Sequence, residues 1–173
     1  MALLNILKIP NPRLKIKAKP VEHVDDAIRS FLNDMVETMY ANDGVGLAAT
    51  QVGVDKRIIV IDAAADEESD RRELMKFINP EILWRSDDVE FMMEGCLSVP
   101  EQYGEVKRSL TLKIRYMNEY NEIIEREASG FLAHAFQHEI DHLNGVLFID
   151  HLSSLKRQLI LRKAAKSHKQ PKL

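Results

Sequence analysis

The chain is poor in cysteine, in net positive charge and in long apolar runs, and each shortage excludes a class of protein. Its single cysteine, Cys96, rules out an internal disulfide, which fits a reducing cytoplasm. The net charge of −3 argues against a general nucleic-acid binder. The apolar run at the start is broken by Lys8, Pro10 and Pro12, so it predicts neither a signal peptide nor a membrane span. We therefore expect a cytoplasmic protein without a membrane partner and without sequence-specific nucleic-acid binding.

The remaining composition is that of an ordinary globular domain. The 173 residues include 45% hydrophobic and 29% charged side chains. This is enough for one domain with a real core and too little for two comfortable ones. No internal repeat is visible, so the function must be sought in short motifs.

The most informative motif is His-Glu-Ile-Asp-His at residues 138–142. Positions four residues apart lie one turn apart on the same face of an α-helix, so His138 and His142 can present two imidazole nitrogens to one metal ion. The carboxylate of Glu139 sits beside that face without needing to bind the metal. Such an arrangement is typical of a hydrolytic site, in which the metal activates water and the carboxylate moves the proton.

Two histidines need a third ligand. His134 precedes His142 by eight residues, or ~12 Å of helix rise, which metal–nitrogen bonds of about 2 Å cannot span. Cys96, within Glu94–Pro100, is the better candidate, because a thiolate binds Zn²⁺ and Fe²⁺ together with histidine. Two histidines and one cysteine leave a fourth position for water, which is the pattern of a catalytic site.

Periodicity and turn residues predict the elements around these motifs. Apolar spacing predicts a helix over 25–41 that starts near Asp25 or Asp26, and a largely apolar helix over 130–143 capped by Ser129 and Gly145. The other expected elements are an extended arm (1–22), a tight turn at Gly44 and Gly46, a strand (56–62), an exposed loop (63–74), short strand pieces (77–80 and 82–84), a β-hairpin (110–116 with 122–127), a short strand (146–149) and a last helix from about residue 153. The predicted fold class is α+β, with mostly antiparallel β-sheets packed around the central motif helix, an N-terminal helix and a C-terminal helix.

Three stretches together resemble the signature motifs of the peptide deformylases of the bacterial type. Gly44–Gln51 matches Gly-x-Gly-Leu-Ala-Ala-x-Gln, Glu94–Ser98 matches Glu-Gly-Cys-Leu-Ser, and Gln137–His142 matches Gln-His-Glu-x-Asp-His. All three match without a gap and in the family's order, and Asn11–Leu14 also looks like the family. The resemblance implies a deformylase catalytic domain over residues 1–152, followed by a C-terminal helix and basic tail over 153–173.

The resemblance also implies a role for individual residues. Cys96, His138 and His142 would hold one divalent metal ion, natively Fe²⁺ in most of the family, with Zn²⁺, Ni²⁺ or Co²⁺ able to replace it. Glu139 would be the general acid and base, and Gln51 with the backbone N–H of Leu97 would stabilise the oxyanion. The predicted substrate contacts are Val45, Gly46 and Gly95 for the peptide backbone, and Val45, Met92, Phe131, His134 and His138 for the methionine side chain.

Glu94 is expected to support the metal site, because it lies two residues before Cys96 and ligating histidines usually donate their second N–H to a carboxylate or carbonyl. By analogy with the family, Arg108 would neutralise that carboxylate. Two positions depart from the family pattern. His134 stands where an apolar residue or arginine is usual, and Tyr103 stands where bacterial relatives often place arginine. These departures concern the side-chain pocket and extended peptide contacts, not the chemistry.

The resemblance thus implies a hydrolase that removes formate from the N-terminal formylmethionine of newly synthesised polypeptides. Its partners would be formylmethionyl nascent peptides and, through the basic tail, the ribosome near the exit tunnel, because residues 156–172 contain seven lysines and arginines and no acid. Two other interpretations stay open. A zincin-type metallopeptidase shares the histidine motif but normally takes a downstream histidine or glutamate as third ligand. A non-catalytic, ribosome-associated module would close a four-ligand structural site with His23, His151 or His168.

Overall fold

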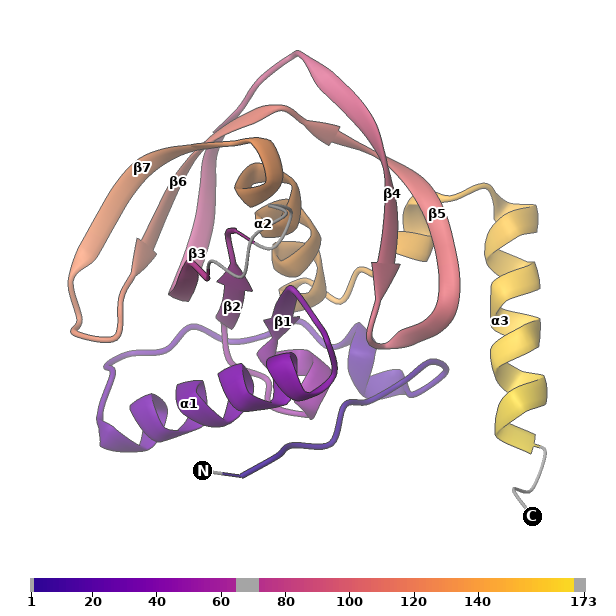
Figure 1. Cartoon of the computed structure of the whole chain (residues 1–173), viewed down its shortest axis with the longest axis horizontal. Coiled ribbons are helices and arrows are strands. Elements are labelled where there is room, and N and C mark those ends of the chain that lie inside the picture. The colour runs from indigo at the N-terminus through magenta and orange to yellow at the C-terminus, as the bar shows by residue number, and fades with distance from the viewer. Residues whose placement is uncertain (1, 65–71, 170–173) are drawn as a thin grey trace.

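A computed structural model describes residues 2–64 and 72–169 of the chain. Its helices and strands are, in chain order, η1 (Pro12–Lys15), α1 (Asp26–Ala41), β1 (Gly46–Ala48), η2 (Ala49–Val52), β2 (Ile58–Asp62), β3 (Leu74–Arg85), β4 (Val89–Cys96), β5 (Val99–Ser109), β6 (Thr111–Met117), β7 (Ile123–Ser129), α2 (Gly130–Leu143), η3 (Phe148–His151) and α3 (Ser154–Lys169), where η marks a 3₁₀ helix. Figure 1 shows α2 inside the fold, between the strands of two sheets. The predicted α+β class with a central motif helix is confirmed.

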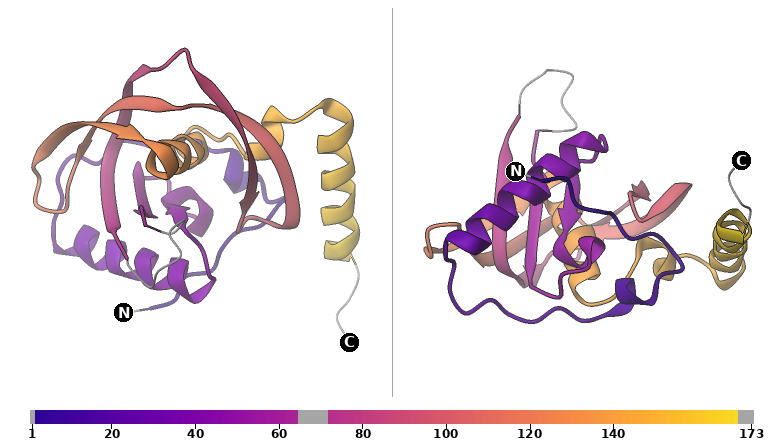
Figure 2. Two further views of the ribbon diagram at one scale, coloured as in Figure 1. Left: turned by 45° about the horizontal axis from the view of Figure 1, so that its top comes forward. Right: turned by 90° about the horizontal axis from the view of Figure 1, so that it is seen from below.

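All strand pairs in the two sheets are antiparallel. The larger sheet has the order β1-β2-β3-β6-β7, and β4 and β5 form a separate two-stranded sheet. Helix α1 and helix α2 cover opposite faces of the larger sheet. Successive side chains of β2 point to opposite faces, and they pack alternately with the two helices. Ile59 and Ile61 pack with α2, whereas Ile58 and Val60 pack with α1. Both views in Figure 2 show α1 running across the outside of this arrangement.

The two predicted helices have the expected ends. Asp25 caps α1 by accepting a hydrogen bond from the backbone N–H of Ile28 at 2.9 Å. Ser129 is the residue before α2 but makes no capping hydrogen bond through its side chain. Asn144 ends α2, and Gly145 follows with a φ of 75° against the backbone of Lys15. A glycine just past a helix end takes this left-handed conformation without the steric penalty of a Cβ.

The hairpin that leads into α2 is also as expected. Strands β6 and β7 are paired from Thr111, which lies opposite Ser129, to Met117, which lies opposite Ile123. A five-residue loop connects them. Asn118 organises this connection, because its side-chain oxygen accepts hydrogen bonds from the backbone N–H groups of Tyr120 and Glu122. The hairpin therefore delivers the chain directly to the start of the motif helix.

Other expectations need correction. The two short strand pieces are one strand, β3, which bulges between Ile78 and Glu81 and again before Trp84. The expected strand at 146–149 is wrong: Phe148 and Ile149 belong to η3, where they are buried in an apolar cluster with Leu147. Within residues 2–22, the arm contains no helix other than η1, and Lys19 makes an isolated β-bridge with Lys56. Residues 65–71 of the expected exposed loop lie outside the described residues.

Helix α3 extends from one side of the molecule and makes few contacts with it (Figure 1). Ile160 is buried where α3 meets the apolar cluster around η3, with Leu161 and Ala164 beside it. Within residues 2–64 and 72–169, no helix has both the length and the apolar content needed to cross a membrane.

Candidate active site

Two segments that are distant in the sequence place one sulfur and two imidazoles together. Helix α2 supplies His138 and His142, and Cys96 ends strand β4. The potential ligand atoms of these three residues all lie within 4.8 Å of one another. The Cys96 Sγ is 3.3 Å from Nε2 of His142. The structure therefore brings together all three residues that were predicted as metal ligands.

This donor set fits a divalent ion of the kind that binds thiolate and imidazole. Bonds of about 2.0 to 2.3 Å in a tetrahedral arrangement keep neighbouring ligand atoms roughly 3.3 to 3.7 Å apart, which the sulfur–nitrogen distance matches. Among the described residues, no other group of His, Cys, Asp and Glu side chains has this convergence. His23 is exposed and His151 bonds to Asp141, so neither supplies a fourth ligand. The side chain of His168 lies outside the described residues.

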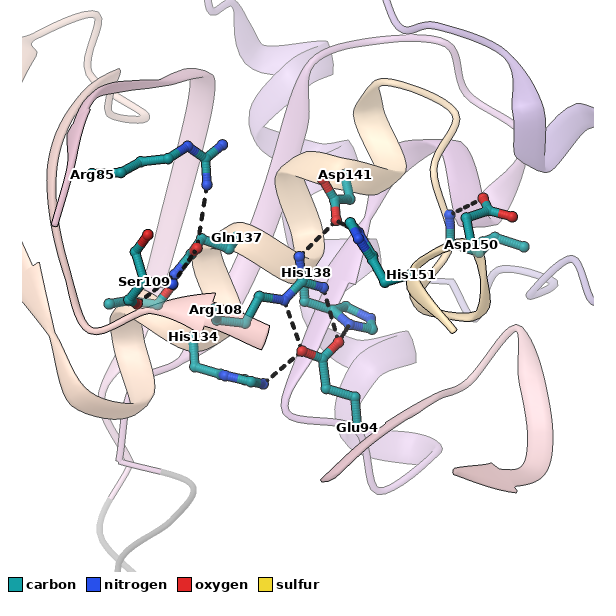
Figure 3. A network of polar contacts seen from close by, with 12 residues as sticks. Arg85, Glu94, Arg108, Ser109, His134, Gln137, His138, Asp141, Asp150 and His151 are labelled. Atoms are coloured by element: carbon teal, nitrogen blue, oxygen red, sulfur yellow. Dashed lines mark hydrogen bonds and ion pairs between the residues drawn. The ribbon is translucent and has the colours of Figure 1, made fainter. Parts of the chain in front are cut away.

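Glu94 holds the orientation of one ligand (Figure 3). Its carboxylate lies 2.7 Å from Nδ1 of His138, which leaves Nε2 of that ring for a metal. Arg108 donates to the same carboxylate from Nε at 2.8 Å and from a terminal nitrogen at 2.9 Å, and His134 contacts it through Nε2 at 2.8 Å. Burial would raise the pKa of Glu94, but the hydrogen bonds from His134, His138 and Arg108 outweigh it and hold the pKa well below its usual range. Glu94 is therefore an anion that accepts four hydrogen bonds.

Asp141 and Gln137 also tie α2 to strand β5, although neither was given a role of its own from the sequence. Arg108 donates to Asp141 at 2.7 Å, and His151 contacts the same oxygen at 2.8 Å. Gln137 accepts from the backbone N–H of Ser109 and donates to its carbonyl. Asp141 and Gln137 both belong to the motif Gln137–His142, and each is the sequence neighbour of a predicted histidine ligand. That position in the sequence was the signal that could have identified them. Figure 3 shows the contacts of Gln137 with Ser109 as one group, and those of Asp141 with Arg108 and His151 as another.

Glu139 faces the cleft from the turn of α2 that carries His138. It is 5% exposed, and its Oε1 is buried without a hydrogen-bond partner among the described residues. A Cβ on Gly46 would lie 2.5 Å from Oε2 of Glu139, so only glycine lets the β1 backbone approach the carboxylate so closely. Burial raises the pKa of Glu139 to about 7, although the charge interaction with His138 acts to lower it.

Gln51 reaches the site from the short helix η2. Its side-chain oxygen accepts a hydrogen bond from the backbone N–H of Ala48, so the side-chain amide must point its hydrogens the other way. That amide donates to Ser98 Oγ at 3.0 Å and lies 3.5 Å from Cys96 Sγ. A donor in this place can hydrogen-bond to a negatively charged oxygen that forms beside the metal ligands.

Cys96, His138 and Glu139 lie on the wall of a cleft of about 850 Å³. Among the predicted substrate-binding residues, those that line it are Val45, Gly46, Gly95, Phe131, His134 and His138, and Leu97 lines it as well. Met92 is not part of this lining. Its side chain and that of Met93 point to opposite faces of β4, and Met93 lines the cleft instead. Tyr103 lines it too, as does the arm around Leu4 and Ile6.

The contact of His134 with Glu94 gives a testable prediction, because it adds a hydrogen-bond donor to that carboxylate. Replacing His134 with Ile should weaken metal retention by roughly tenfold, the usual cost of losing a hydrogen bond that supports a metal ligand. His134→Gln is the matched control, since its side-chain amide can still donate to the carboxylate. The measurement is the metal content of each purified protein after competition with a chelator. Equal retention by all three proteins would show that His134 does not support the ligand.

Comparisons with known proteins give a consistent answer. The family described as polypeptide deformylase matches residues 3–158. A peptide deformylase of Phenylobacterium zucineum is 53% identical over 169 residues, covering 98% of this chain and 99% of the relative. One of Pseudomonas aeruginosa is 50% identical over 170 residues, with 98% and 99% covered. The crystal structure of peptide deformylase from Ehrlichia chaffeensis in complex with actinonin is similar with a TM-score of 0.92 and 39% identity, covering 98% of this chain and 100% of that one.

Proposed function

This chain belongs to the polypeptide deformylase family and removes the N-formyl group from nascent peptides, and on that premise we propose how its own residues perform the reaction. Cys96, His138 and His142 would hold one divalent metal ion. We propose Fe²⁺ as the native ion, with Zn²⁺, Ni²⁺ or Co²⁺ able to substitute, because one thiolate and two imidazoles accept each of these metals. When bound, the ion would supply Lewis-acid chemistry, which makes water a competent nucleophile near neutral pH.

Glu139 is the residue that moves protons. Its unpartnered Oε1 and its place on the cleft wall suit a general base that takes a proton from the attacking water. The water oxygen bonds to the formyl carbon, and the carbonyl oxygen becomes negatively charged. Glu139 then gives its proton to the amine nitrogen, the carbon–nitrogen bond breaks, and formate leaves together with the free amino terminus.

Gln51 and Leu97 are proposed to hold the oxygen that becomes negative. The side-chain amide of Gln51 is oriented by Ala48 and lies near Cys96. The backbone N–H of Leu97 follows Cys96 directly in the chain. Two fixed donors stabilise the developing charge without having to reorganise during the reaction.

The substrate would be held on both sides of the cleft. Val45 and Gly46 on one side and Gly95 on the other would bind the peptide backbone, and Phe131 and His134 would contact the methionine side chain. All five line the cleft, which supports this arrangement. Glu94 and Arg108 would act indirectly, by keeping His138 in the orientation that binds the metal.

The observation that carries this mechanism is the position of Glu139 beside the Cys96–His138–His142 cluster, against the bare backbone of Gly46. Its test is formate release from formyl-Met-Ala-Ser, compared with acetate release from acetyl-Met-Ala-Ser and with new amino termini in an unfolded casein. A formyl carbon carries only hydrogen, whereas an acetyl or peptide carbonyl carbon carries a carbon substituent. The segments Gly44–Gln51 and Glu94–Ser98 approach the metal ligands from two sides and would clash with that substituent.

We expect formate from the first peptide, far slower acetate release from the second, and no internal cleavage of casein. Internal cleavage without formate release would instead assign the site to a metallopeptidase. Acetate released as fast as formate would refute the steric argument while leaving the metal site intact.

We further propose that residues 1–152 form the catalytic domain and that the helix and tail over 153–173 dock on the ribosome in the cytoplasm, near the tunnel exit. Lys156, Arg162, Lys163 and Lys166 are exposed on α3. Phosphate groups of ribosomal RNA attract such side chains, and the attraction weakens as salt rises.

Co-sedimentation with ribosomes tests this docking. The change of Lys163 and Lys166 to Glu should reduce the bound fraction several-fold at low salt, because each neutralised phosphate contact contributes to affinity. The same double change at Lys113 and Arg115, both exposed on β6 and not on α3, is the matched control and should retain binding. Equal co-sedimentation of the wild type and the α3 variant would refute the proposal.

A further inference from the structure

The outward face of the β4–β5 hairpin carries large apolar side chains that the fold does not bury. Phe91, Met93 and Tyr103 are 65, 62 and 63% exposed, respectively. Side chains alternate along β4, so Phe91 and Met93 point away from the buried Glu94. Tyr103 joins them because its ring covers Gly95, where a Cβ would lie 2.6 Å from the Tyr103 Cε1. We call Phe91, Met93 and Tyr103 the hairpin shelf.

The hairpin shelf is continuous with the cleft that holds the metal-binding residues. Met93 and Tyr103 line that cleft together with Cys96. Phe91 precedes Met93 by two residues in β4, so its side chain lies on the same face of the strand, farther from the cleft. The residues paired with Met93 and Phe91 on β5 are Glu105 and Lys107, both exposed, so no apolar cover comes from β5. The shelf thus begins at the reaction site and leads away from it.

Strand β4 also has an edge on which a peptide can pair. Among the described residues, β4 is hydrogen-bonded only to β5 in a two-stranded sheet. In Figure 1, β4 is the strand of this hairpin nearer to β1. The cleft is lined by Gly46 of β1 and by Met93, Gly95 and Cys96 of β4, so it borders both strands. An extended peptide can add to such an edge as a further strand, which gives affinity through the backbone and specificity through alternate side chains.

The position of Cys96 at the end of β4 sets the register of such a peptide. With formylmethionine opposite Cys96, an antiparallel peptide runs back along β4, and its second, fourth and sixth residues fall opposite Gly95, Met93 and Phe91. The sixth residue then lies about 17 Å from the first, at roughly 3.4 Å per residue. Alternation turns the methionine inward, toward Phe131 and His134, and turns the second, fourth and sixth side chains outward onto the shelf.

We propose that the hairpin shelf binds apolar side chains at the second, fourth and sixth positions of the formylated polypeptide. This inference rests on the proposed function of the cleft and adds a preference beyond formylmethionine. Contacts made far from the reacting carbon add binding energy that raises kcat/KM. The enzyme should therefore process nascent chains with this apolar pattern faster than chains of the same composition in another order.

Two hexapeptides of identical composition test the inference. One is formyl-Met-Ala-Ser-Leu-Ser-Phe, with apolar residues at positions four and six. The other is formyl-Met-Ala-Leu-Ser-Phe-Ser, with the same residues at positions three and five. We expect kcat/KM for formate release to be about three- to tenfold higher for the first peptide, the range given by partial burial of one or two apolar side chains. Phe91→Ser should lower that ratio at least twofold, and Phe91→Leu should retain it.

Ile123→Ser is the matched control, because Ile123 is 66% exposed on β7, outside the hairpin. It should leave the ratio unchanged. Equal kcat/KM for the two hexapeptides, a higher value for the second, or a ratio that survives Phe91→Ser would each overturn the shelf. Absence of formate from both hexapeptides and from formyl-Met-Ala-Ser would instead refute the proposed function, so the two failures are distinguishable.

Discussion

Glu139→Gln is expected to abolish most of the activity while the protein keeps its fold and its metal. The amide has nearly the same shape as the carboxylate but cannot take up the proton of the attacking water. General acid–base catalysis typically contributes about 10²- to 10⁴-fold, so the loss in kcat should be at least about 100-fold. The fold should tolerate the change, because no hydrogen bond to Glu139 Oε1 is lost and a neutral group is cheaper to bury than a charged one. The measurements are kcat on formyl-Met-Ala-Ser, metal content and thermal unfolding.

Glu127→Gln provides the matched control for this experiment. Glu127 is exposed on β7 and does not line the cleft, so the same chemical change there should alter neither activity nor metal content. Near wild-type turnover by Glu139→Gln would reject the proton-transfer role. Loss of metal by the same variant would mean that the carboxylate contributes to the metal site rather than to the proton transfer.

The helices and strands whose apolar residues recur at a regular spacing were predictable from sequence. The 3.6-residue repeat of α1 and α2 and the alternation of β6 follow directly from which face of each element meets the core. The metal ligands were predictable because helix geometry fixes the spacing of His138 and His142, and because only one cysteine is present. Local helix geometry determined which two imidazoles could meet, and the single cysteine was the remaining candidate for the third ligand.

The β4–β5 hairpin was not predictable in the same way, because it inverts the usual pattern. An antiparallel strand with one covered face normally turns apolar residues inward and polar ones outward. Here the inward face carries Glu94 and Arg108, which neutralise each other, while Phe91 and Met93 face outward. The ion-pair partner of Glu94 is Arg108, which lies 14 residues away in the sequence, so no rule about neighbouring residues reveals it. The strand expected at 146–149 failed for a related reason, since a short apolar run indicates burial but not whether the chain is extended.

Cys96→Ser is expected to remove the metal and, with it, the reaction. A serine hydroxyl stays neutral near pH 7 and binds divalent metals far more weakly than a thiolate, so the affinity should fall by more than about 100-fold, beyond the usual effect of residues that merely support a ligand. The protein should still fold, because Cys96 ends β4 at a half-buried position and serine has nearly the same size. His142→Ala should lose the metal equally, since it removes another member of the cluster, whereas His23→Ala, a change at an exposed histidine, should retain it. The measurement is metal content after anaerobic purification and dialysis, with circular dichroism to verify folding. One full metal equivalent in Cys96→Ser would exclude the sulfur as a ligand, and metal lost from His23→Ala would point to a closed structural site instead of a catalytic one.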